Sequence, residues 1–333
     1  MQVRTTGNIR YGMPLVVIVC PKEFTFSDPG ATVERGVLDG TAEVRTINLD
    51  FHEPLPPEAL AADVLLLWHN VPIDAGTITQ LKNCRALIRN GTGYDSVDTQ
   101  AAAAHGIPVC NVPDYGTEEV ADHALALTLA LCRQLFPLDA EAKRLGWKIN
   151  TSDKMHRLRG QVFGVVGLGA IGTATALRAK AFGFRVIFHD PYLPRGARKA
   201  LGIERAESLD ELLGAADVLS VHCPLTHETR GLIGARELAL MKPSAFLVNT
   251  ARGDIVQKAA VLDALRHNRL AGAGLDVVEN EPLRSAAEAA TPNLIVTCHA
   301  AFCSPEGMIE MRTSSARIAQ AAILAQPIWN RVN

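Results

Sequence analysis

Short apolar runs rich in Val, Ile and Leu alternate with helix-like segments along the first third of the chain. Runs of this kind, bounded by glycine, proline or polar residues, are typical of buried parallel strands. The alternation predicts a βα repeat around a parallel sheet. The predicted strands lie at residues 15–19, 44–47, 63–67, 86–89 and 107–110.

A second series of apolar runs begins after Arg159. Its predicted strands lie at residues 162–166, 185–189, 218–222, 245–248, 274–278 and 294–297. Strands in this number and order fit one doubly wound sheet with helices on both faces. We therefore predict an α/β protein with two parallel-sheet domains of the Rossmann-like or flavodoxin-like kind.

Longer helical segments flank the second series. Residues 118–147 form one or two predicted helices broken at Pro137, and 120–132 is apolar nearly all round, which predicts burial. A last helix is predicted at about 305–324. We expect residues 1–117 and 301–333 to form a discontinuous substrate domain. Residues 118–300 then form an inserted dinucleotide-binding domain, and the site lies between the two.

Composition excludes several classes of protein. With 333 residues and 48% hydrophobic residues, the chain can build two full cores. The net charge of −2 shows no basic excess that would indicate a nucleic-acid partner. No apolar run reaches membrane-spanning length. The seven cysteines include no CxxC pair, and residues 1–11 contain no apolar signal core. We therefore expect a cytoplasmic protein without a metal site.

A glycine motif follows the first strand of the second series. Gly167, Gly169 and Gly172 form GxGxxG, and a predicted helix begins near Ala170 and Ile171. Three glycines at this spacing are common by chance, but a strand before them and a helix after them favour dinucleotide binding. The glycines permit a tight turn, and the helix N-terminus offers N–H groups to a pyrophosphate.

An acidic residue stands where such motifs bind the ribose. Asp190 ends the next predicted strand, and its carboxylate can accept hydrogen bonds from ribose hydroxyl groups. The same charge would repel a 2′-phosphate, which favours NAD over NADP. Arg195 lies close enough in the sequence to accommodate a phosphate, so this preference remains open.

Polar residues stand at the ends of three later strands. Arg252 follows the strand at 245–248, Glu281 comes after 274–278, and His299 comes after 294–297. Alone, Arg252 fits a surface ion pair equally well, and His299 fits a buried core histidine better. Because the carboxyl ends of parallel strands meet at one edge of a sheet, the three together favour a carboxylate clamp and an acid/base pair.

At this point the chain resembles the D-2-hydroxyacid dehydrogenase family over nearly its full length. The likeness rests on the glycine motif with Asp190, on 249–253, on 276–282 and on His299. Within the family it is most similar to the branch that contains the C-terminal binding protein corepressors. The segments that carry this finer likeness are 89–98, 109–113, 118–122, 178–183 and 190–193.

The resemblance implies roles for individual residues. Arg252 binds the carboxylate and carbonyl of a 2-oxo acid, His299 exchanges a proton with the carbonyl oxygen, and Glu281 pairs with His299. Five residues are expected to bind substrate: Arg89, Gly91, Thr92, Gly93 and Phe302. The residues expected to contact NAD are Thr117, Gly167, Gly169, Ala170, Ile171, Gly172, Asp190, His222, Cys223, Pro224, Asn249, Thr250, Ala251 and Asp276.

The chain departs from the family pattern at two positions. Cys298 stands where the family usually has proline, and Phe302 stands where the corepressor branch has tryptophan. The implied activity is the reversible reduction of a 2-oxo acid to a D-2-hydroxy acid with NADH, in a homodimer formed through 120–132. The alternative is a regulatory protein that senses NAD(H), like the corepressors. A methyltransferase that binds S-adenosylmethionine fits the three strand-end residues poorly.

Overall fold

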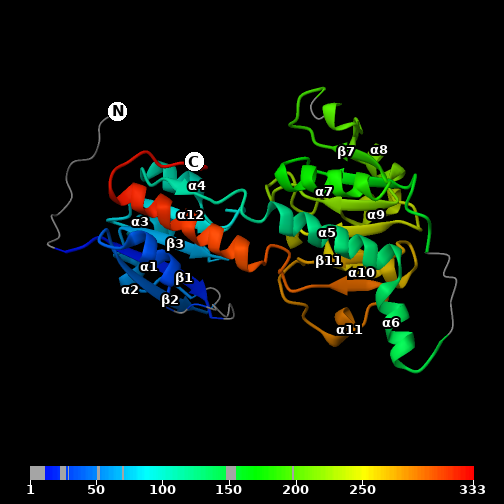
Figure 1. Cartoon of the computed structure of the whole chain (residues 1–333), viewed down its shortest axis with the longest axis horizontal. Coiled ribbons are helices and arrows are strands. Elements are labelled where there is room, and N and C mark those ends of the chain that lie inside the picture. Colours follow the sequence, from blue (N-terminus) through cyan, green and yellow to red (C-terminus); the bar gives the residue numbers. More distant parts are fainter. Residues whose placement is uncertain are drawn as a thin grey trace. The chain divides into compact units, whose positions relative to one another are not determined.

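The computed structural model describes residues 12–22, 28, 30–50, 53–69, 71–147, 155–196 and 199–333. Residues 1–11, in which we expect no signal sequence, lie outside this part. The chain divides into two compact units, one comprising Met1–Gly116 with Ser304–Asn333 and the other Thr117–Cys303. Figure 1 shows the elements of each unit.

The first unit is built on a five-stranded parallel sheet in the order β2-β1-β3-β4-β5. This is the flavodoxin-like order of a doubly wound sheet. The strands are β1 (Leu15–Pro21), β2 (Glu43–Leu49), β3 (Val64–Trp68), β4 (Ala86–Asn90) and β5 (Val109–Cys110). The central strands β3 and β4 are buried along their whole length, as expected for a parallel sheet covered on both faces.

Helices from both ends of the chain cover this sheet. They are α1 (Thr32–Leu38), α2 (Pro57–Leu60), α3 (Ala75–Gln80), α4 (Thr99–Ala104) and α12 (Pro305–Ile323). The last helix, α12, packs against α1, β3 and β4 (Figure 1). Arg312 on α12 donates to buried Glu34 on α1 at 2.8 Å and to Asp28 at 2.7 Å. This buried ion network ties the C-terminal segment to the N-terminal sheet.

The second unit contains a seven-stranded parallel sheet in the order β12-β11-β10-β9-β6-β7-β8. The order reverses between β6 and β9, as in dinucleotide-binding Rossmann folds. The strands are β6 (Val162–Val166), β7 (Arg185–His189), β8 (Glu204–Arg205), β9 (Val218–Val221), β10 (Phe246–Asn249), β11 (Gly272–Leu275) and β12 (Leu294–Val296). The predicted fold class, two parallel-sheet α/β domains, is therefore confirmed.

Two details of this sheet differ from the sequence-based prediction. Strand β8 was not predicted, because it has two residues and both are charged. Strand β11 ends at Leu275, so Asp276 and the residues after it belong to a loop. The helices of this unit are α5 (Thr117–Cys132), α6 (Leu135–Lys143), α7 (Ala170–Ala181), α8 (Leu209–Ala215), α9 (Ala235–Leu240), α10 (Lys258–Arg266) and α11 (Ala286–Ala289).

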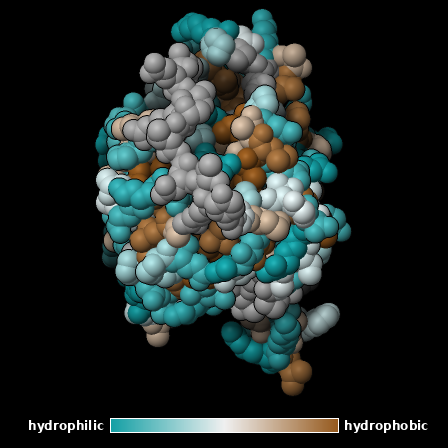
Figure 2. Space-filling view, turned by 90° about the vertical axis from the view of Figure 1, so that its left-hand side faces the viewer, coloured by the Kyte–Doolittle hydropathy of each residue, from teal (hydrophilic) through white to brown (hydrophobic). Residues whose placement is uncertain are grey.

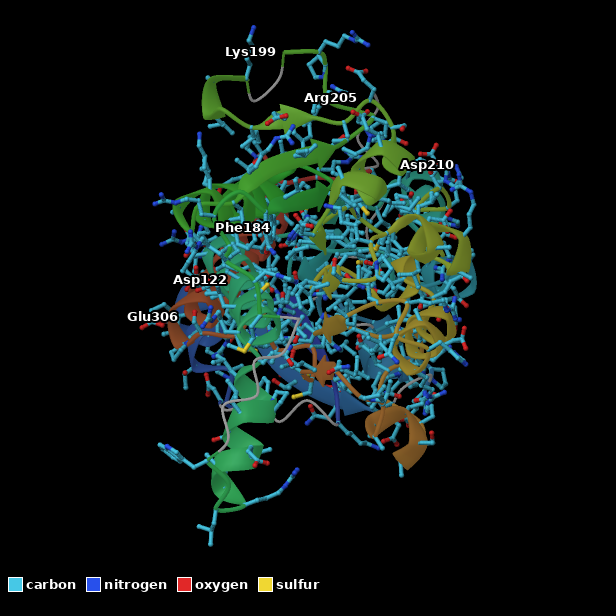
Figure 3. All side chains as sticks on the ribbon, turned by 90° about the vertical axis from the view of Figure 1, so that its right-hand side faces the viewer. Asp122, Phe184, Lys199, Arg205, Asp210 and Glu306 are labelled. Atoms are coloured by element: carbon cyan, nitrogen blue, oxygen red, sulfur yellow. The ribbon has the colours of Figure 1, made fainter. Side chains whose placement is uncertain are left out.

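Helix α5 is buried within its own unit. Nine of its residues are buried, and it packs against α7, β10 and β11 (Figure 1). Glycines on β11 permit this approach, since a Cβ added at Gly274 would lie 3.0 Å from the Cβ of Leu127. Asp122, labelled in Figure 3, accepts a hydrogen bond from Arg178 of α7 at 2.5 Å. The apolar character of 120–132 is thus explained by contacts within the chain.

The helical break after α5 is not at Pro137. The break falls at Arg133 and Gln134, where Gln134 adopts a left-handed φ of 54°. Pro137 lies in the first turn of α6, where a backbone N–H has no partner within the helix and its absence does little harm. Pro137 therefore lies at the start of a helix and does not break one.

Within the described residues, none of the helices combines the length and the apolar character needed to cross a bilayer. On the face shown in Figure 2, hydrophilic residues surround the apolar patches.

Candidate active site

The glycine turn between β6 and α7 has three distinct local environments. Gly167 has a left-handed φ of 85°, and a Cβ there would lie 2.7 Å from the backbone of Cys223. A Cβ at Gly172 would collide with the carbonyl oxygen of Gly167, so this glycine lets the helix pack closely. Gly169 is exposed, and a Cβ there would meet nothing within 4 Å. Open space over the middle glycine fits a pyrophosphate that approaches the backbone closely.

The ends of β6 and β9 meet beside this turn. His222 directly follows β9, and its Nε2 lies 2.8 Å from the hydroxyl of Ser220. Burial of the imidazole lowers the pKa of His222 to about 4. Burial also raises the pKa of the Cys223 thiol to about 11. Pro224 follows, and its carbonyl accepts a hydrogen bond from Thr229 at 2.6 Å. The segment from His222 to Pro224 is therefore uncharged near neutral pH.

Asp190 joins the loop after β7 to the glycine turn. Its carboxylate accepts hydrogen bonds from the N–H of Leu168 at 2.9 Å and from the N–H of Tyr192 at 3.0 Å. Arg205, labelled in Figure 3, donates to the carbonyl oxygen of Asp190 at 2.9 Å. The exposed Arg195 donates to Glu207 at 2.9 Å, so its guanidinium already has an acidic partner. The acidic side chain is thus oriented by the backbone of the turn.

The turn after β10 is organised by an amide side chain. Asn249 accepts a hydrogen bond from the N–H of Ala251 at 3.0 Å and donates to the carbonyl of Arg252 at 2.9 Å. Arg252 donates to the carbonyl oxygen of Ala251 at 2.8 Å. The hydroxyl of Thr250 is buried and has no hydrogen-bond partner among the described residues. A buried hydroxyl in that state fits a site that is completed by a polar ligand such as NAD.

A close backbone contact joins this turn to the loop after β11. A Cβ on Gly253 would collide with the carbonyl of Val278. The N–H of Val278 in turn donates to Oε1 of Glu281 at 3.3 Å. Glycine at position 253 therefore lets the loop that carries Arg252 pack directly on the loop that carries Glu281.

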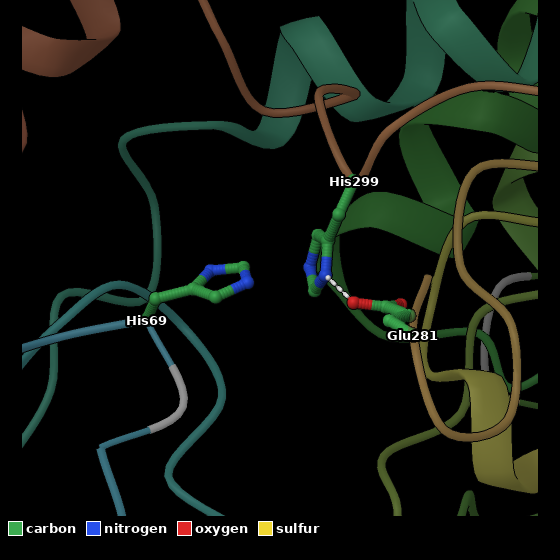
Figure 4. A group of neighbouring side chains, drawn as sticks. All are labelled: His69, Glu281 and His299. Atoms are coloured by element: carbon green, nitrogen blue, oxygen red, sulfur yellow. Dashed lines mark hydrogen bonds and ion pairs between the residues drawn. The ribbon is translucent and has the colours of Figure 1, made fainter. Parts of the chain in front are cut away.

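His299 and Glu281 form a hydrogen-bonded pair. Nδ1 of His299 lies 3.0 Å from Oε2 of Glu281 (Figure 4). Both side chains are partly buried, with exposures of 17% and 30%. The ring of Phe302 meets the His299 ring edge-on, with centroids 6.2 Å apart. His69, which Figure 4 also draws, belongs to the other unit. A carboxylate on Nδ1 fixes the imidazole ring and leaves Nε2 for another partner.

Asp276 holds the backbone that carries His299. Its carbonyl accepts the N–H of His299 at 2.8 Å, and its carboxylate accepts the N–H groups of Ala300 and Ala301, each at 3.0 Å. His299 has a left-handed φ of 52°, a conformation that few residues other than glycine adopt. Backbone of this kind persists when its surroundings enforce it, and here Asp276 supplies that enforcement.

Two further residues of this network were missed by the sequence analysis. The hydroxyl of Thr297 donates to Oδ1 of Asp276 at 2.5 Å, and Nε2 of His123 lies 3.0 Å from the same hydroxyl. His123 is on α5, which also begins with Thr117. A single histidine in an apolar helix gives no sequence signal that would connect it to a distant strand end.

The predicted substrate loop lies in the first unit. The guanidinium of Arg89 lies close to Gly91, because a Cβ on Gly91 would collide with it. Gly91 has a φ of 139°. The Thr92 carbonyl accepts from Asn111 at 2.7 Å, and Gly93 follows in the same loop. The loop is thus held by its neighbours, while the second unit brings together Asp276, Glu281, His299 and Phe302.

Comparison with known proteins supports a dehydrogenase. Residues 125–301 match the family "D-isomer specific 2-hydroxyacid dehydrogenase, NAD binding domain". The chain is 36% identical over 296 residues to the D-3-phosphoglycerate dehydrogenase of Mycobacterium bovis, covering 89% of this chain. It spans only 56% of that relative's length. The corepressor-like branch predicted above stays a prediction.

Two solved structures are similar over nearly the whole chain. One is D-lactate dehydrogenase from Aquifex aeolicus complexed with NAD and lactic acid, with a TM-score of 0.85, 26% identity, and coverage of 95% of this chain and 98% of that one. The other is the NADPH-dependent glyoxylate/hydroxypyruvate reductase of Sinorhizobium meliloti in complex with NADP and malonate. Its TM-score is 0.81, with 27% identity and coverage of 96% and 97%.

Proposed function

Because the chain belongs to the D-isomer specific 2-hydroxyacid dehydrogenase family and carries its NAD-binding domain, we propose that it reversibly reduces a 2-oxo acid to a D-2-hydroxy acid. The observation that carries this proposal is the His299–Glu281 pair beside the turn of Arg252. NAD(H), when bound, supplies or accepts the hydride. The protein supplies the groups that bind and orient the acid and move the proton.

In the proposed mechanism, Arg252 binds the substrate carboxylate and polarises the carbonyl. A carboxylate can only accept, so Nδ1 of His299 carries the hydrogen shared with Glu281. Nε2 of His299 is then the atom that gives a proton to the developing alkoxide during reduction and removes it during oxidation. The cation of Arg252 stabilises the negative charge that builds on the oxygen. Arg89, Gly91, Thr92 and Gly93 are proposed to bind the acid as well.

The residues near the glycine turn favour NAD over NADP. Asp190 is held by the N–H groups of Leu168 and Tyr192, with its charge beside the turn that approaches the pyrophosphate. A 2′-phosphate on the ribose would be repelled there. Arg195, the residue considered as a phosphate partner, is paired with Glu207. We propose the remaining cofactor contacts to be those predicted from the sequence, with Thr250 donating or accepting through its buried hydroxyl.

We further propose a homodimer in which a second copy covers α6. None of the residues of α6 is buried, and Leu135 and Phe136 are 53% and 58% exposed. Leu145 and Trp147, just after the helix, are 96% and 91% exposed. Exposed apolar side chains in such density mark interaction surfaces. A sedimentation experiment should show a dimer that Phe136→Glu shifts toward monomer.

The activity is tested with a panel of 2-oxo acids (glyoxylate, pyruvate, hydroxypyruvate, and aromatic and branched acids), monitored by NADH absorbance with NADPH in parallel. We expect at least one acid to be reduced, and His299→Asn to abolish turnover while NADH still binds. Tight NADH binding without turnover of any acid would instead support the regulatory alternative. The proposed substrate class refers to this chain, which spans only 56% of the length of the D-3-phosphoglycerate dehydrogenase that it resembles.

A further inference from the structure

We propose that His123 is a positioning residue for the catalytic histidine, acting through Thr297 and Asp276. This inference rests on the proposed function of His299. The four residues all lie in the second unit, on α5 and in the loops after β11 and β12. His123 does not touch the pair of His299 and Glu281 by any contact described above, so its influence has to pass through the two residues between them.

The direction of each hydrogen bond can be deduced. The Thr297 hydroxyl donates its single proton to Oδ1 of Asp276 at 2.5 Å. The hydroxyl oxygen of Thr297 also lies 3.0 Å from Nε2 of His123, so it must accept there, and Nε2 of His123 must carry hydrogen. Nε2 also lies 3.7 Å from Oδ1 of Asp276. The imidazole thus determines where the Thr297 proton points, which is toward the carboxylate.

The carboxylate then fixes the residues that follow His299. Oδ1 of Asp276 accepts the N–H of Ala300 as well as the Thr297 hydroxyl, and Oδ2 accepts the N–H of Ala301. A rotation of this carboxylate would leave one of these groups without a partner in a buried place, where Asp276 is 2% exposed. His123 and Thr297 therefore oppose that rotation, and they help hold His299 at its left-handed φ.

Two substitutions remove the chain of bonds, and two retain it. His123→Phe and Thr297→Val eliminate the donor and the relay, whereas His123→Gln and Thr297→Ser keep an N–H and a hydroxyl. Thr128→Val is the matched control on the same helix, because the Thr128 hydroxyl donates only to the carbonyl of Ala124 in the bonds described, at 2.8 Å. We expect the first two variants to lower kcat about tenfold while KM and the Kd for NADH change less than about twofold.

Rescue by the conservative variants distinguishes positioning from packing. His123→Gln and Thr297→Ser should recover kcat to within about threefold of the original, and Thr128→Val should leave it unchanged. Unchanged kcat in both His123→Phe and Thr297→Val would overturn the inference. So would an equal loss in Thr297→Ser, since the retained hydroxyl would then fail to restore activity.

A readout without turnover separates this inference from the proposed function. Hydrogen exchange at the N–H groups of Ala300 and Ala301 should be faster in His123→Phe and Thr297→Val than in Thr128→Val. If no 2-oxo acid is reduced, or if His299→Asn keeps full activity, the proposed function fails while this exchange result still tests the network. If the original chain is active and His299→Asn is not, the proposed function stands. Unaltered exchange in both network variants would then overturn this inference and leave the proposed function intact.

Discussion

Asp276 holds His299 by three successive backbone N–H groups, from residue 299 itself to residue 301. The histidine has a left-handed φ of 52°, a conformation that few residues other than glycine adopt. An acidic residue after β11 therefore acts on the residue after β12 through the main chain. Its function in the site is therefore in part to hold the backbone.

Replacement of Asp276 by asparagine tests this hold. An amide nitrogen cannot accept a hydrogen bond, so one N–H of Ala300 or Ala301 would lose its partner. We expect the free energy of unfolding to fall by about 1–3 kcal/mol, as for a buried donor left unsatisfied, and kcat to fall because His299 is released. Urea denaturation and steady-state kinetics measure the two effects. Unchanged stability together with unchanged kcat would contradict the role.

The three glycines of the turn predict three different outcomes. Gly167→Ala and Gly172→Ala should each lower the free energy of unfolding by about 2 kcal/mol or more, because the first has a left-handed φ and the second meets a backbone oxygen. Gly169→Ala should leave stability within about 0.5 kcal/mol, since nothing lies near the added methyl group. It should nevertheless weaken NADH binding by occupying the space proposed for the pyrophosphate.

Calorimetric unfolding and NADH titration of the same three variants make this comparison. Equal stability loss at all three positions would show that the turn is generally intolerant of side chains. Normal NADH affinity in Gly169→Ala would place the pyrophosphate elsewhere.

Much of the second unit was accessible to sequence reasoning because its strands are apolar and its chemistry stands at strand ends. Arg252, Glu281 and His299 follow consecutive strands of one parallel sheet, and such strand ends share an edge. The glycine motif was informative for the same reason, since a strand precedes it and a helix follows it. Local pattern and global fold agree at these positions.

Other features could not be predicted, because they depend on contacts between distant segments. His123 meets Thr297 across a large sequence separation, and helical periodicity alone assigns such a residue to the core. The apolar face of α5 suggested a dimer interface, yet β10, β11 and α7 cover it. Strand β8 is formed by pairing of Glu204 and Arg205 with β7, a tertiary effect that overrides their low β-propensity.

Substitution of Arg252 by lysine tests the proposed clamp. Lysine keeps the charge but offers a point charge in place of a planar fork with two parallel donors. Loss of one charged hydrogen bond, at about 1.5–3 kcal/mol, should lower kcat/KM for the 2-oxo acid by roughly 10- to 100-fold. NADH affinity should change little. Arg230→Lys is the matched control, since the exposed Arg230 pairs with Asp254. Equal effects of the two substitutions would argue against the clamp.

The buried imidazole of His222 should make stability depend on pH. Burial lowers its pKa from the usual value of 6.5 to about 4 in the folded chain. Between these values the unfolded chain binds a proton that the folded chain does not, so stability falls as pH decreases from about 6.5 to about 4 and its contribution is constant outside this window. We expect this loss of stability to be about 1–3 kcal/mol.

Urea denaturation of the original chain and of His222→Asn at pH 7.5, 6 and 5 isolates this contribution, since every other titrating group is common to both. The difference in unfolding free energy between the two proteins should be constant above pH 7, where His222 is neutral in both states. Toward lower pH the original chain should lose stability relative to His222→Asn, because only the original chain carries the penalty of a histidine that stays uncharged when folded. A difference that does not change between pH 7.5 and 5 would mean that His222 takes up its proton as readily in the folded chain as in the unfolded one. Water would then reach the imidazole beside Cys223.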